Sequence, residues 1–352
     1  MNIIVIGIDL AKNIFAVHGV DENGKAALVK PKVARDQLLQ LIANLPPCLI
    51  GMEACPEPVE VACSGAHHWA RLFRQHGHTV NLMAPKFVTP YRMSGRRGKN
   101  DAQDAAAICE AVTRPKMRFV PIKEEHQQII LCLHRTRQGF VEERTATYNR
   151  LRGLIAEFGI VLAQKVTGLR QHIGAHLEDL PGYAQRCIGD LLAHADQLDA
   201  RIADYDQAIA RAAREDAASR RLMERPGIGP ITASALLASI GNGHDFSSGR
   251  QVAAWIGLTP GQHSSGGRAR LGHITKAGDH YLRSLLVMGA RAVLNSVGDK
   301  QDPFSCWARR LVERRGYWRA VVAIAAKNAR LAWAVLKYGE DFRLTQRAAG
   351  TP

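Results

Sequence analysis

Two short apolar runs near the start of the chain each end in an acidic residue. The run NIIVIGI at residues 2–8 is followed by Asp9, and the run PPCLIGM at residues 46–52 is followed by Glu53. Short apolar runs rich in β-branched residues are typical of buried strands. Polar groups at the carboxyl ends of such strands meet at one edge of the sheet. The chain is therefore expected to fold around a sheet that carries two acids at one end.

The neighbouring segments complete an α/β pattern. The further elements that the sequence predicts are strands at 14–20 and 78–85, a hairpin turn at 21–25, and helices at 35–45 and 66–77. Strands joined first by a hairpin and then by helices indicate an α/β domain. We place this domain at residues 1–120.

Residues 121–220 are predicted to be long helices because they carry helical periodicity and no strand signal. Apolar residues recur there at alternating spacings of three and four, as in a coiled coil. The positions are Ile188, Leu191, Ala195, Leu198, Ile202, Tyr205 and Ile209. This seam can pair within the chain or across a dimer, and the spacing alone leaves both open.

Residues 221–352 are predicted to form a third, mostly α-helical domain. The segment RPGIGPITASALLASIG at 225–241 has the form of a helix–hairpin–helix. Gly227 and Gly229 would make a tight turn whose N–H groups meet a phosphate beside a helix N-terminus. An ordinary turn between two helices is the alternative.

The net charge of +15 is concentrated in three segments. Residues 86–118, 250–291 and 309–330 carry net charges of +5, +5 and +6. Clustering of this kind is typical of proteins that bind a polyanion, which favours nucleic acid. A membrane surface is disfavoured because no basic segment is an amphipathic helix with a broad apolar face.

Other features of the composition point to a cytoplasmic protein. No apolar run is long enough for a membrane span, and MNIIVIGIDL lacks the basic start and cleavage site of a signal peptide. The seven cysteines show no CxxC pair, which favours reduced thiols.

The stretch RRGKNDAQDAAAI at 96–108 supplies two more acids. Asp101 and Asp104 are three residues apart, so on a helix their side chains lie on one face. They directly follow three cations, Arg96, Arg97 and Lys99. Taken alone, the pair can be a solvated helix start, since aspartate complements the helix dipole there.

Together with Asp9 and Glu53, these acids predict a metal site. Four converging carboxylates would repel one another without a cation, and ligation by oxygen alone selects Mg²⁺ or Mn²⁺. Two such ions can hold the attacking and leaving oxygens of a phosphodiester. The cations at 96–99 would hold the nucleic-acid backbone nearby. Glu60 is a rival to Glu53, which we prefer because it directly ends an apolar strand.

Structural zinc is a weaker alternative for this part of the chain. Its candidate ligands are Cys55, Cys63, His67, His68, His76 and His78. No pair among them has the spacing of a zinc finger.

The segment GLTPGQHSSGGRARLGHITKAG at 257–278 offers a candidate nucleophile. Its SSGG sequence at residues 264–267 presents a flexible, exposed hydroxyl, and a serine can attack phosphorus. Arg268, Arg270 and Lys276 follow and can offset the charge that develops on phosphoryl oxygens. A polar loop that only binds DNA phosphates is the competing interpretation.

The order of the acids resembles that of a RuvC-like (ribonuclease H-type) DEDD nuclease domain. GIDLAK also resembles the phosphate-binding turn of actin-like sugar kinases, but the sequence lacks the further glycine-rich loops that those enzymes need. The whole chain resembles DEDD-type insertion-sequence transposases of the bridge-RNA-guided recombinase family. The motifs that carry this resemblance are GIDLAKNIFAVH, GMEAC, SGRRGKNDAQDAAAI, RPGIGPITA and GLTPGQHSSGG…ITKAG.

This resemblance implies a RuvC-like domain joined through a coiled coil to a C-terminal transposase domain. The family's metal-binding acids correspond to Asp9, Glu53, Asp101 and Asp104. Its nucleophilic serine corresponds to Ser265, with Ser264 as the alternative. It also implies a structured non-coding RNA that pairs with double-stranded donor and target DNA. Dimers or tetramers are implied as well, with active sites that combine acids of one subunit with the serine of another.

The resulting expectation is a Mg²⁺-dependent, RNA-guided DNA recombinase with a covalent phosphoserine intermediate. Base pairing with the RNA would choose the sequence, while protein cations hold the backbone. Two alternatives are kept. One is a junction-resolving type of metal nuclease in which water is the nucleophile. The other is a non-catalytic nucleic-acid scaffold that uses the helix–hairpin–helix and the basic segments.

Overall fold

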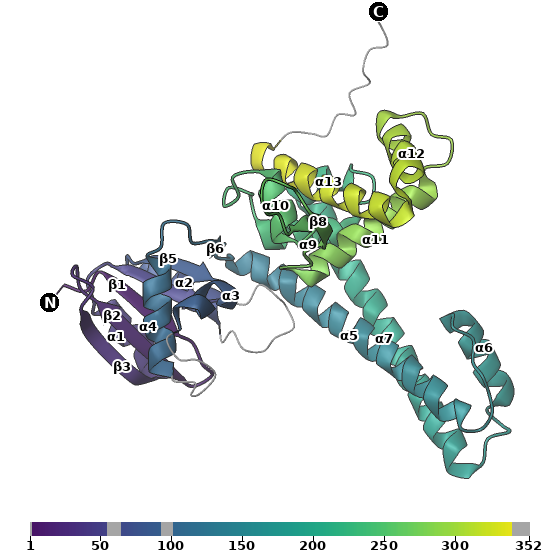
Figure 1. The fold of residues 1–352 in the computed structure, drawn as a ribbon. Helices are drawn as coiled ribbons and strands as arrows, with labels where there is room; N and C mark the ends of the chain where they lie inside the picture. The colour runs from purple at the N-terminus through teal and green to yellow at the C-terminus, as the bar shows by residue number, and fades with distance from the viewer. Residues whose placement is uncertain (1, 55–64, 93–100, 340–352) are drawn as a thin grey trace, which may run out of the picture.

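The computed structural model describes residues 2–54, 65–92 and 101–339 of the chain. Figure 1 shows three parts in chain order: an N-terminal sheet with helices packed on it, a pair of long helices, and a helical C-terminal part. Six residues singled out in the sequence lie outside the described residues: Cys55, Glu60, Cys63, Arg96, Arg97 and Lys99.

The N-terminal part is built on a six-stranded sheet with the strand order β3-β2-β1-β4-β5-β6. The strands are β1 (Val5–Asp9), β2 (Ile14–Val20), β3 (Ala26–Ala34), β4 (Leu49–Glu53), β5 (Thr79–Met83) and β6 (Phe119–Val120). β1, β4 and β5 are parallel neighbours, whereas β2, β3 and β6 pair in the antiparallel sense. This mixed sheet confirms the predicted α/β class and is consistent with a RuvC-like domain.

Two strands of this sheet were not predicted from the sequence. β3 is an edge strand, mostly exposed, and Lys30, Pro31 and Lys32 interrupt its apolar pattern. Proline and lysine are common on edge strands because they discourage pairing with another chain. β6 has only two residues, too few to show any alternation.

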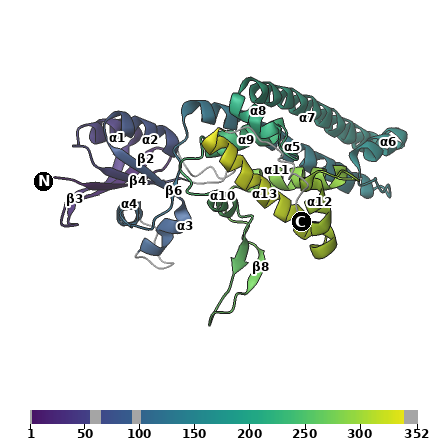
Figure 2. The same cartoon turned by 90° about the horizontal axis from the view of Figure 1, so that it is seen from above.

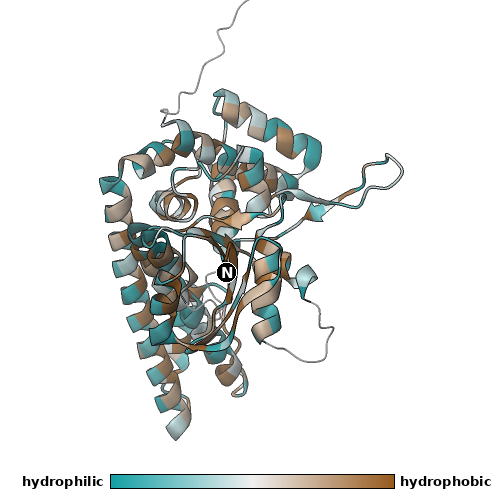
Figure 3. Ribbon diagram, turned by 90° about the vertical axis from the view of Figure 1, so that its left-hand side faces the viewer, coloured by the Kyte–Doolittle hydropathy of each residue, from teal (hydrophilic) through white to brown (hydrophobic). Residues whose placement is uncertain are grey.

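Helices cover both faces of the sheet. α1 (Arg35–Ala43) and α2 (Ala66–Gln75) pack on one face, where Ile6, Ile50 and Phe73 belong to the same buried cluster. α4 (Asp101–Val112) packs on the opposite face, beside the short α3 (Pro85–Val88) and the 3-10 turn η1 (Thr89–Tyr91). The strands seen at the centre of Figure 3 are coloured largely as hydrophobic, as a sheet buried on both faces requires.

Two glycines allow α4 to lie unusually close to the strands. A Cβ on Gly7 would lie 2.1 Å from the backbone oxygen of Ala105, and one on Gly51 would lie 2.8 Å from Cβ of Val112. Both positions therefore accept no side chain while α4 stays in place. The small residues of α4 serve the same close approach, as its run of alanines suggests.

The middle of the chain is an antiparallel pair of long helices, α5 (Glu125–Ala156) and α7 (Gly182–Glu215), with α6 (Val166–His176) packed at their far end. Five of the seven seam positions on α7 are buried, and the other two, Leu191 and Tyr205, are half-buried. The seam faces α5 of the same chain, since the ring of Tyr205 packs edge-on against Phe140. Of the two alternatives, the structure has the α7 seam paired with a helix of the same chain.

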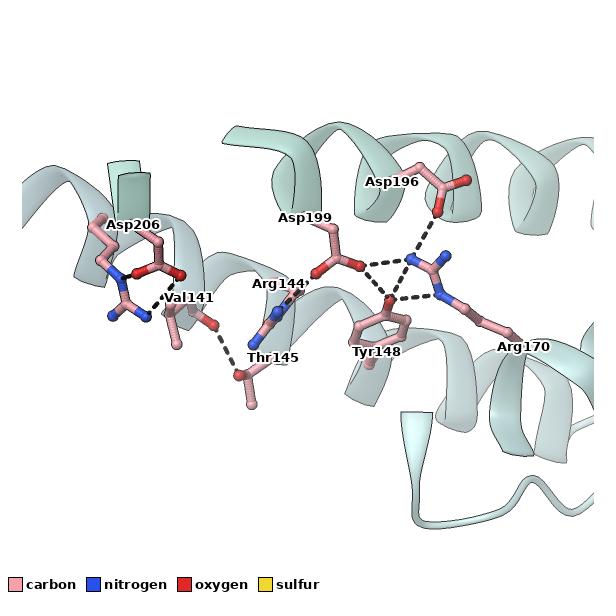
Figure 4. A network of polar contacts seen from close by, with 9 residues as sticks. Val141, Arg144, Thr145, Tyr148, Arg170, Asp196, Asp199 and Asp206 are labelled. Carbon is pink, nitrogen blue, oxygen red and sulfur yellow. Dashed lines mark hydrogen bonds and ion pairs between the residues drawn. The ribbon is translucent and has the colours of Figure 1, made fainter. Parts of the chain in front are cut away.

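Polar contacts along the two helices fix their register (Figure 4). Arg144 pairs with Asp199 at 2.7 Å, and the Tyr148 hydroxyl donates to the same carboxylate at 3.2 Å. Arg170 of α6 reaches both Asp196 and Asp199 at 2.7 Å. Single exposed ion pairs stabilise a protein by only about 0–1 kcal/mol. The network therefore acts mainly by specifying which turns of the helices meet.

The C-terminal part packs its helices around one apolar core. The elements are α8 (Ala217–Met223), α9 (Pro230–Ile240), α10 (Gly249–Trp255), β7 (Pro260–Gln262), β8 (Leu271–Ile274), α11 (His280–Ser296), α12 (Pro303–Arg315) and α13 (Tyr317–Tyr338). β7 and β8 form a separate two-stranded hairpin that projects from this body, as Figure 2 shows. No helix among the described residues is both long and apolar enough to cross a membrane.

Buried polar contacts join the three parts. His134 of α5 lies 2.9 Å from the Tyr281 hydroxyl of α11 and 2.9 Å from the Ser234 hydroxyl of α9. Just before α5 begins, the backbone N–H of Lys123 donates to His67 of α2 at 3.2 Å. Burial lowers the pKa of His134 to about 4, so this ring is neutral and both its nitrogens can serve the network.

The close packing of α4 predicts a large cost for Gly7→Ala. The new methyl group would overlap the backbone of α4, and overpacking of this kind costs about 1–3 kcal/mol or more. Unfolding by urea should show the loss. Gly153→Ala on exposed α5 is the control, since nothing lies within 4 Å of its Cβ and the change should be neutral or stabilise by up to about 1 kcal/mol. Equal stability of the two variants would contradict the close approach.

Candidate metal centre and serine hairpin

Asp9 and Glu53 end two neighbouring parallel strands, as the sequence predicted. Gly7 lies beside Gly51 and Ile8 beside Met52 in the register of β1 and β4, so the next positions are Asp9 and Glu53. Side chains alternate along a strand, so each acid shares a face with the glycine two residues before it. That is the face on which α4 packs.

The first turn of α4 brings the other two acids to the same place. α4 runs antiparallel to β1, because Gly7 approaches Ala105 while Cys109, one turn later, reaches the backbone oxygen of Val5. Its N-terminus therefore lies at the carboxyl end of the strands. One carboxylate oxygen from each of Asp9, Asp101 and Asp104 lies within 4.8 Å of the others.

Glu53 lies within electrostatic reach of this cluster. Burial raises the pKa of Glu53, the Arg92 guanidinium lowers it, and the charges of Asp9 and Asp104 raise it further. Arg92 Nη2 lies 2.9 Å from Glu53 Oε1, and Arg92 Nε lies 3.0 Å from Asp104 Oδ1. The structure thus brings all four predicted acids to one site, with Arg92 between two of them.

The donor set of this site suits a hard divalent cation. Every candidate ligand is a carboxylate oxygen, and Mg²⁺ and Mn²⁺ prefer such ligands. Asp104 is buried and Asp9 half-buried, so water shields their repulsion only in part, while Asp101 is exposed on the open side. A bound cation would offset this repulsion and remain reachable from solvent.

Arg92 is a site residue that the sequence analysis did not single out. It lies in the basic segment 86–118, but only as one of its eight Lys and Arg residues. Its role depends on η1, which places it next to the acids.

A second missed signal was present in the sequence. Each strand acid follows a glycine by two residues, in GID and in GME, and this pattern marks the face that α4 approaches.

Ser265 lies at the tip of the β7–β8 hairpin. Gly266 and Gly267 have φ values of +55° and +75°, which suit the two central residues of a type I′ hairpin turn. Ser265 and Arg268 flank the turn, and the backbone N–H of Arg268 donates to the backbone carbonyl oxygen of Ser265 at 3.1 Å. The hydroxyl is therefore presented by a turn that only glycine forms without strain.

The two adjacent serines differ in their hydrogen bonds. The Ser264 hydroxyl accepts from Gln262 Nε2 at 2.7 Å and from the Arg270 N–H at 3.2 Å. The Ser265 hydroxyl has no hydrogen-bond partner among residues 2–54, 65–92 and 101–339. Ser265 thus carries the less constrained hydroxyl of the two, with the exposed Arg268 and Arg270 beside it.

The hairpin and the acids are separate in this chain. β7 and β8 pair with each other, and the hairpin extends away from the helical body in Figures 2 and 3. Within the part of the chain that the structure describes, the main packing of β7 and β8 is with each other and not with β1, β4 or α4. A reaction that uses both groups needs another arrangement of the parts or a second chain.

The remaining predicted nucleic-acid contacts lie in two turns. Gly227 has φ of +85°, and a Cβ there would lie 2.8 Å from the backbone oxygen of Gly289, so this glycine serves helix packing. Gly229 is exposed at the N-cap of α9. Lys276 is exposed at the base of the hairpin, with φ of +52°, and its N–H donates to the Gly257 oxygen at 3.1 Å.

The zinc alternative finds no support among the described residues. His67 accepts from Lys123, and burial lowers its pKa to about 3. His78 lies 3.4 Å from the Cys48 sulfur and 3.1 Å from the Ile42 oxygen. Within those residues the acid cluster is the one group of potential metal ligands. Cys55 and Cys63 lie outside them.

Comparison with known proteins identifies the family. A transposase model of the IS110 DEDD type matches residues 6–160, and the model described as Transposase IS116/IS110/IS902 family matches residues 219–304. A probable family 20 transposase of Pseudomonas aeruginosa is 44% identical, over 97% of this chain and 99% of its own. The transposase for insertion sequence element IS1111A of Coxiella burnetii is 38% identical, over 96% and 91%. The transposase for IS1328 of Yersinia enterocolitica is 36% identical, over 97% and 99%.

The N-terminal part is a DEDD transposase domain. It has a sheet with acids at its carboxyl edge, and the DEDD model matches residues 6–160. The chain belongs to the IS116/IS110/IS902 family of insertion-sequence transposases. Membership implies cleavage and transfer of DNA strands, and the DEDD domain suggests the use of a divalent metal.

The acid cluster predicts a loss of metal binding in Asp104→Asn. The change keeps the shape of the side chain but removes a buried ligand charge, so the affinity for Mn²⁺ should fall by more than about tenfold. Titration of Mn²⁺ followed by electron paramagnetic resonance measures this directly. Glu110→Gln is the matched control, because Glu110 is an exposed acid on α4 that pairs with Arg114. An affinity that changes equally in both variants would place the metal elsewhere.

Proposed function

We propose that this transposase is a Mg²⁺-dependent recombinase that cuts and rejoins DNA through a serine-linked intermediate. The observation that carries the proposal is the cluster of Asp9, Asp101 and Asp104, with Glu53 beside it, at one edge of the sheet. The position of Ser265 at a hairpin tip supports the serine-linked intermediate. We further propose the division into a RuvC-like domain at 1–120, a coiled-coil region at 121–220 and a transposase domain at 221–352.

The four acids would hold the metal beside the scissile phosphate. A bound Mg²⁺ supplies Lewis-acid stabilisation of the charge that develops on the phosphoryl oxygens. The carboxylates orient the ion, and the buried position of Asp104 fixes one ligand in place. Arg96, Arg97 and Lys99 precede α4 in the sequence and would hold the DNA backbone at this edge.

The serine would act by direct displacement at phosphorus. Its oxygen forms a bond to phosphorus while the bond from phosphorus to one sugar oxygen breaks, and that oxygen leaves with a proton. The phosphoserine ester keeps the energy of the broken bond for rejoining. Arg268, Arg270 and Lys276 stand on or at the base of the same hairpin and would offset the charge on the phosphoryl oxygens.

The separation of serine and acids supports an assembly of several chains. Because Ser265 lies away from the acid cluster of its own chain, we propose that acids of one subunit act with the serine of another, in a homodimer or homotetramer. A structured guide RNA would pair with donor and target DNA. The basic segments at 250–291 and 309–330, together with Gly227 and Gly229, would contact nucleic-acid backbone.

A covalent adduct tests the role of the serine. The wild-type protein, mixed with element DNA and Mg²⁺, should give a protein–DNA band on a denaturing gel, and Ser265→Ala should lose it. Ser264→Ala is the control, since that hydroxyl is tied within the hairpin and should retain most of the adduct. If Ser264→Ala loses the adduct and Ser265→Ala keeps it, the assignment is reversed.

A metal nuclease with water as nucleophile is the second candidate. The observation that favours it is the same separation, since a hairpin far from the acids can bind DNA without reacting. This candidate predicts metal-dependent cleavage by Ser265→Ala at the wild-type rate and no adduct with either protein.

RNA guidance predicts that a defined RNA accompanies the protein. Purification of the full chain from cells that carry its element, followed by sequencing of the bound RNA, should yield one structured species. Its loops should be complementary to the DNA that flanks the element. Recovery of unrelated cellular RNAs in proportion to their abundance would count against guidance.

A further inference from the structure

Arg92 occupies the position of a counter-ion inside the acid site. Its Nη2 lies 2.9 Å from Glu53 Oε1 and its Nε lies 3.0 Å from Asp104 Oδ1, so one guanidinium spans two of the proposed metal ligands. Both acids are well covered, with side-chain exposures of 15% and 10%. A guanidinium stays charged at any ordinary pH. It therefore supplies the positive charge that these acids need when no metal is bound.

The contacts of Arg92 use oxygens that a metal ion also needs. A carboxylate oxygen that accepts from a guanidinium directs a lone pair away from any ion placed between the acids. Arg92 therefore takes up part of the capacity of Glu53 and Asp104 to bind a metal, through a hydrogen bond to Glu53 and an ion pair with Asp104. The charges of Arg92 and a bound metal also repel one another at this distance.

The geometry also shows how Arg92 can leave. Its side chain is 31% exposed, about two to three times as much as those of its two partners. The contact between Nε and Asp104 lacks the alignment of a hydrogen bond and is an ion pair only. Among the side-chain contacts of Arg92 with described residues, only the one to Glu53 is a hydrogen bond. A long side chain held by one aligned bond at the rim of the site can turn outward without disturbing the sheet.

We propose that Arg92 is a built-in placeholder cation, which neutralises Glu53 and Asp104 in the metal-free protein and is displaced when the divalent ion binds. Arg92 is thus a positioning residue that keeps the empty site assembled at the cost of weaker metal binding. This inference rests on the proposed metal site. It assigns to Arg92 the function of holding the acids together when no metal is bound.

The test compares Mn²⁺ binding to the wild type and to Arg92→Gln in the full-length protein without DNA. Removal of the competing charge should tighten Mn²⁺ binding by about tenfold, since a charge-assisted contact no longer has to break. Electron paramagnetic resonance of unbound Mn²⁺ gives the affinity. If Arg92 instead helped to hold the metal, as an orienting residue does, Arg92→Gln would bind Mn²⁺ more weakly, which would overturn the proposal.

Arg114→Gln is the matched control. Arg114 lies against the ring of Tyr91, the neighbour of Arg92, and pairs with Glu110 of α4. The variant removes the same charge from the same region without touching the acid site. Tightening of Mn²⁺ binding in both variants would mean a general effect of net charge and would refute the placeholder role.

Stability provides an independent readout. Without metal, Arg92→Gln should melt at a lower temperature than the wild type, and Mn²⁺ should raise its melting temperature by a larger increment. If the variant does not fold alone, refolding with Mn²⁺ should restore its circular dichroism spectrum, and failure to do so would count against the inference. A wild type that binds no Mn²⁺ would remove the proposed metal site as well, whereas unchanged binding in Arg92→Gln would remove only the role of Arg92.

Discussion

The packing of α4 directly against the backbone of β1 and β4 is the contact on which the acid site depends. Gly7 and Gly51 leave no side chain between the helix and the strands, and the alanines of α4 match that surface. Asp9 and Glu53 follow these two glycines by two residues and lie on the same face of the sheet. Asp101 and Asp104 lie in the first turn of the helix that packs there. The close packing of helix and strands therefore brings the four carboxylates close together. Apolar contacts thus hold the carboxylates at the edge of the sheet in positions where their negative charges repel one another.

The two chemical groups of the protein are held in different ways. The acids stand on strands and on a buried helix, so their positions follow from the core. Ser265 stands on a hairpin whose contacts are mainly its own, at the end of an exposed extension. In chain order the helix pair comes between them, and polar contacts around Asp199 fix its register. The acid site is thus fixed by the core, whereas the serine hydroxyl stands on an exposed hairpin. This arrangement suits a reaction in which the two groups come together only when chains assemble.

Much of this arrangement could be predicted from sequence because the signals were strong and local. The strands that end in Asp9 and Glu53 are buried apolar runs, and the α7 seam is a plain heptad pattern. β3 escaped because an exposed edge strand has no apolar face to reveal it. Arg92 escaped because its partners are 39 and 12 residues away and its neighbours are equally basic. The pairing of α7 with α5 required knowledge of which face each helix turns inward, which spacing on one helix does not contain.

The acid site is assembled from segments that are synthesised far apart. Asp9 and Glu53 precede α4 by most of a domain, and the cluster exists only when the last helix of that domain has docked on the strands. A nascent or truncated chain that stops before Asp101 has two separated acids and no site for a metal. A growing chain therefore completes the acid site once α4 has been made, well before it contains the β7–β8 hairpin that carries Ser265.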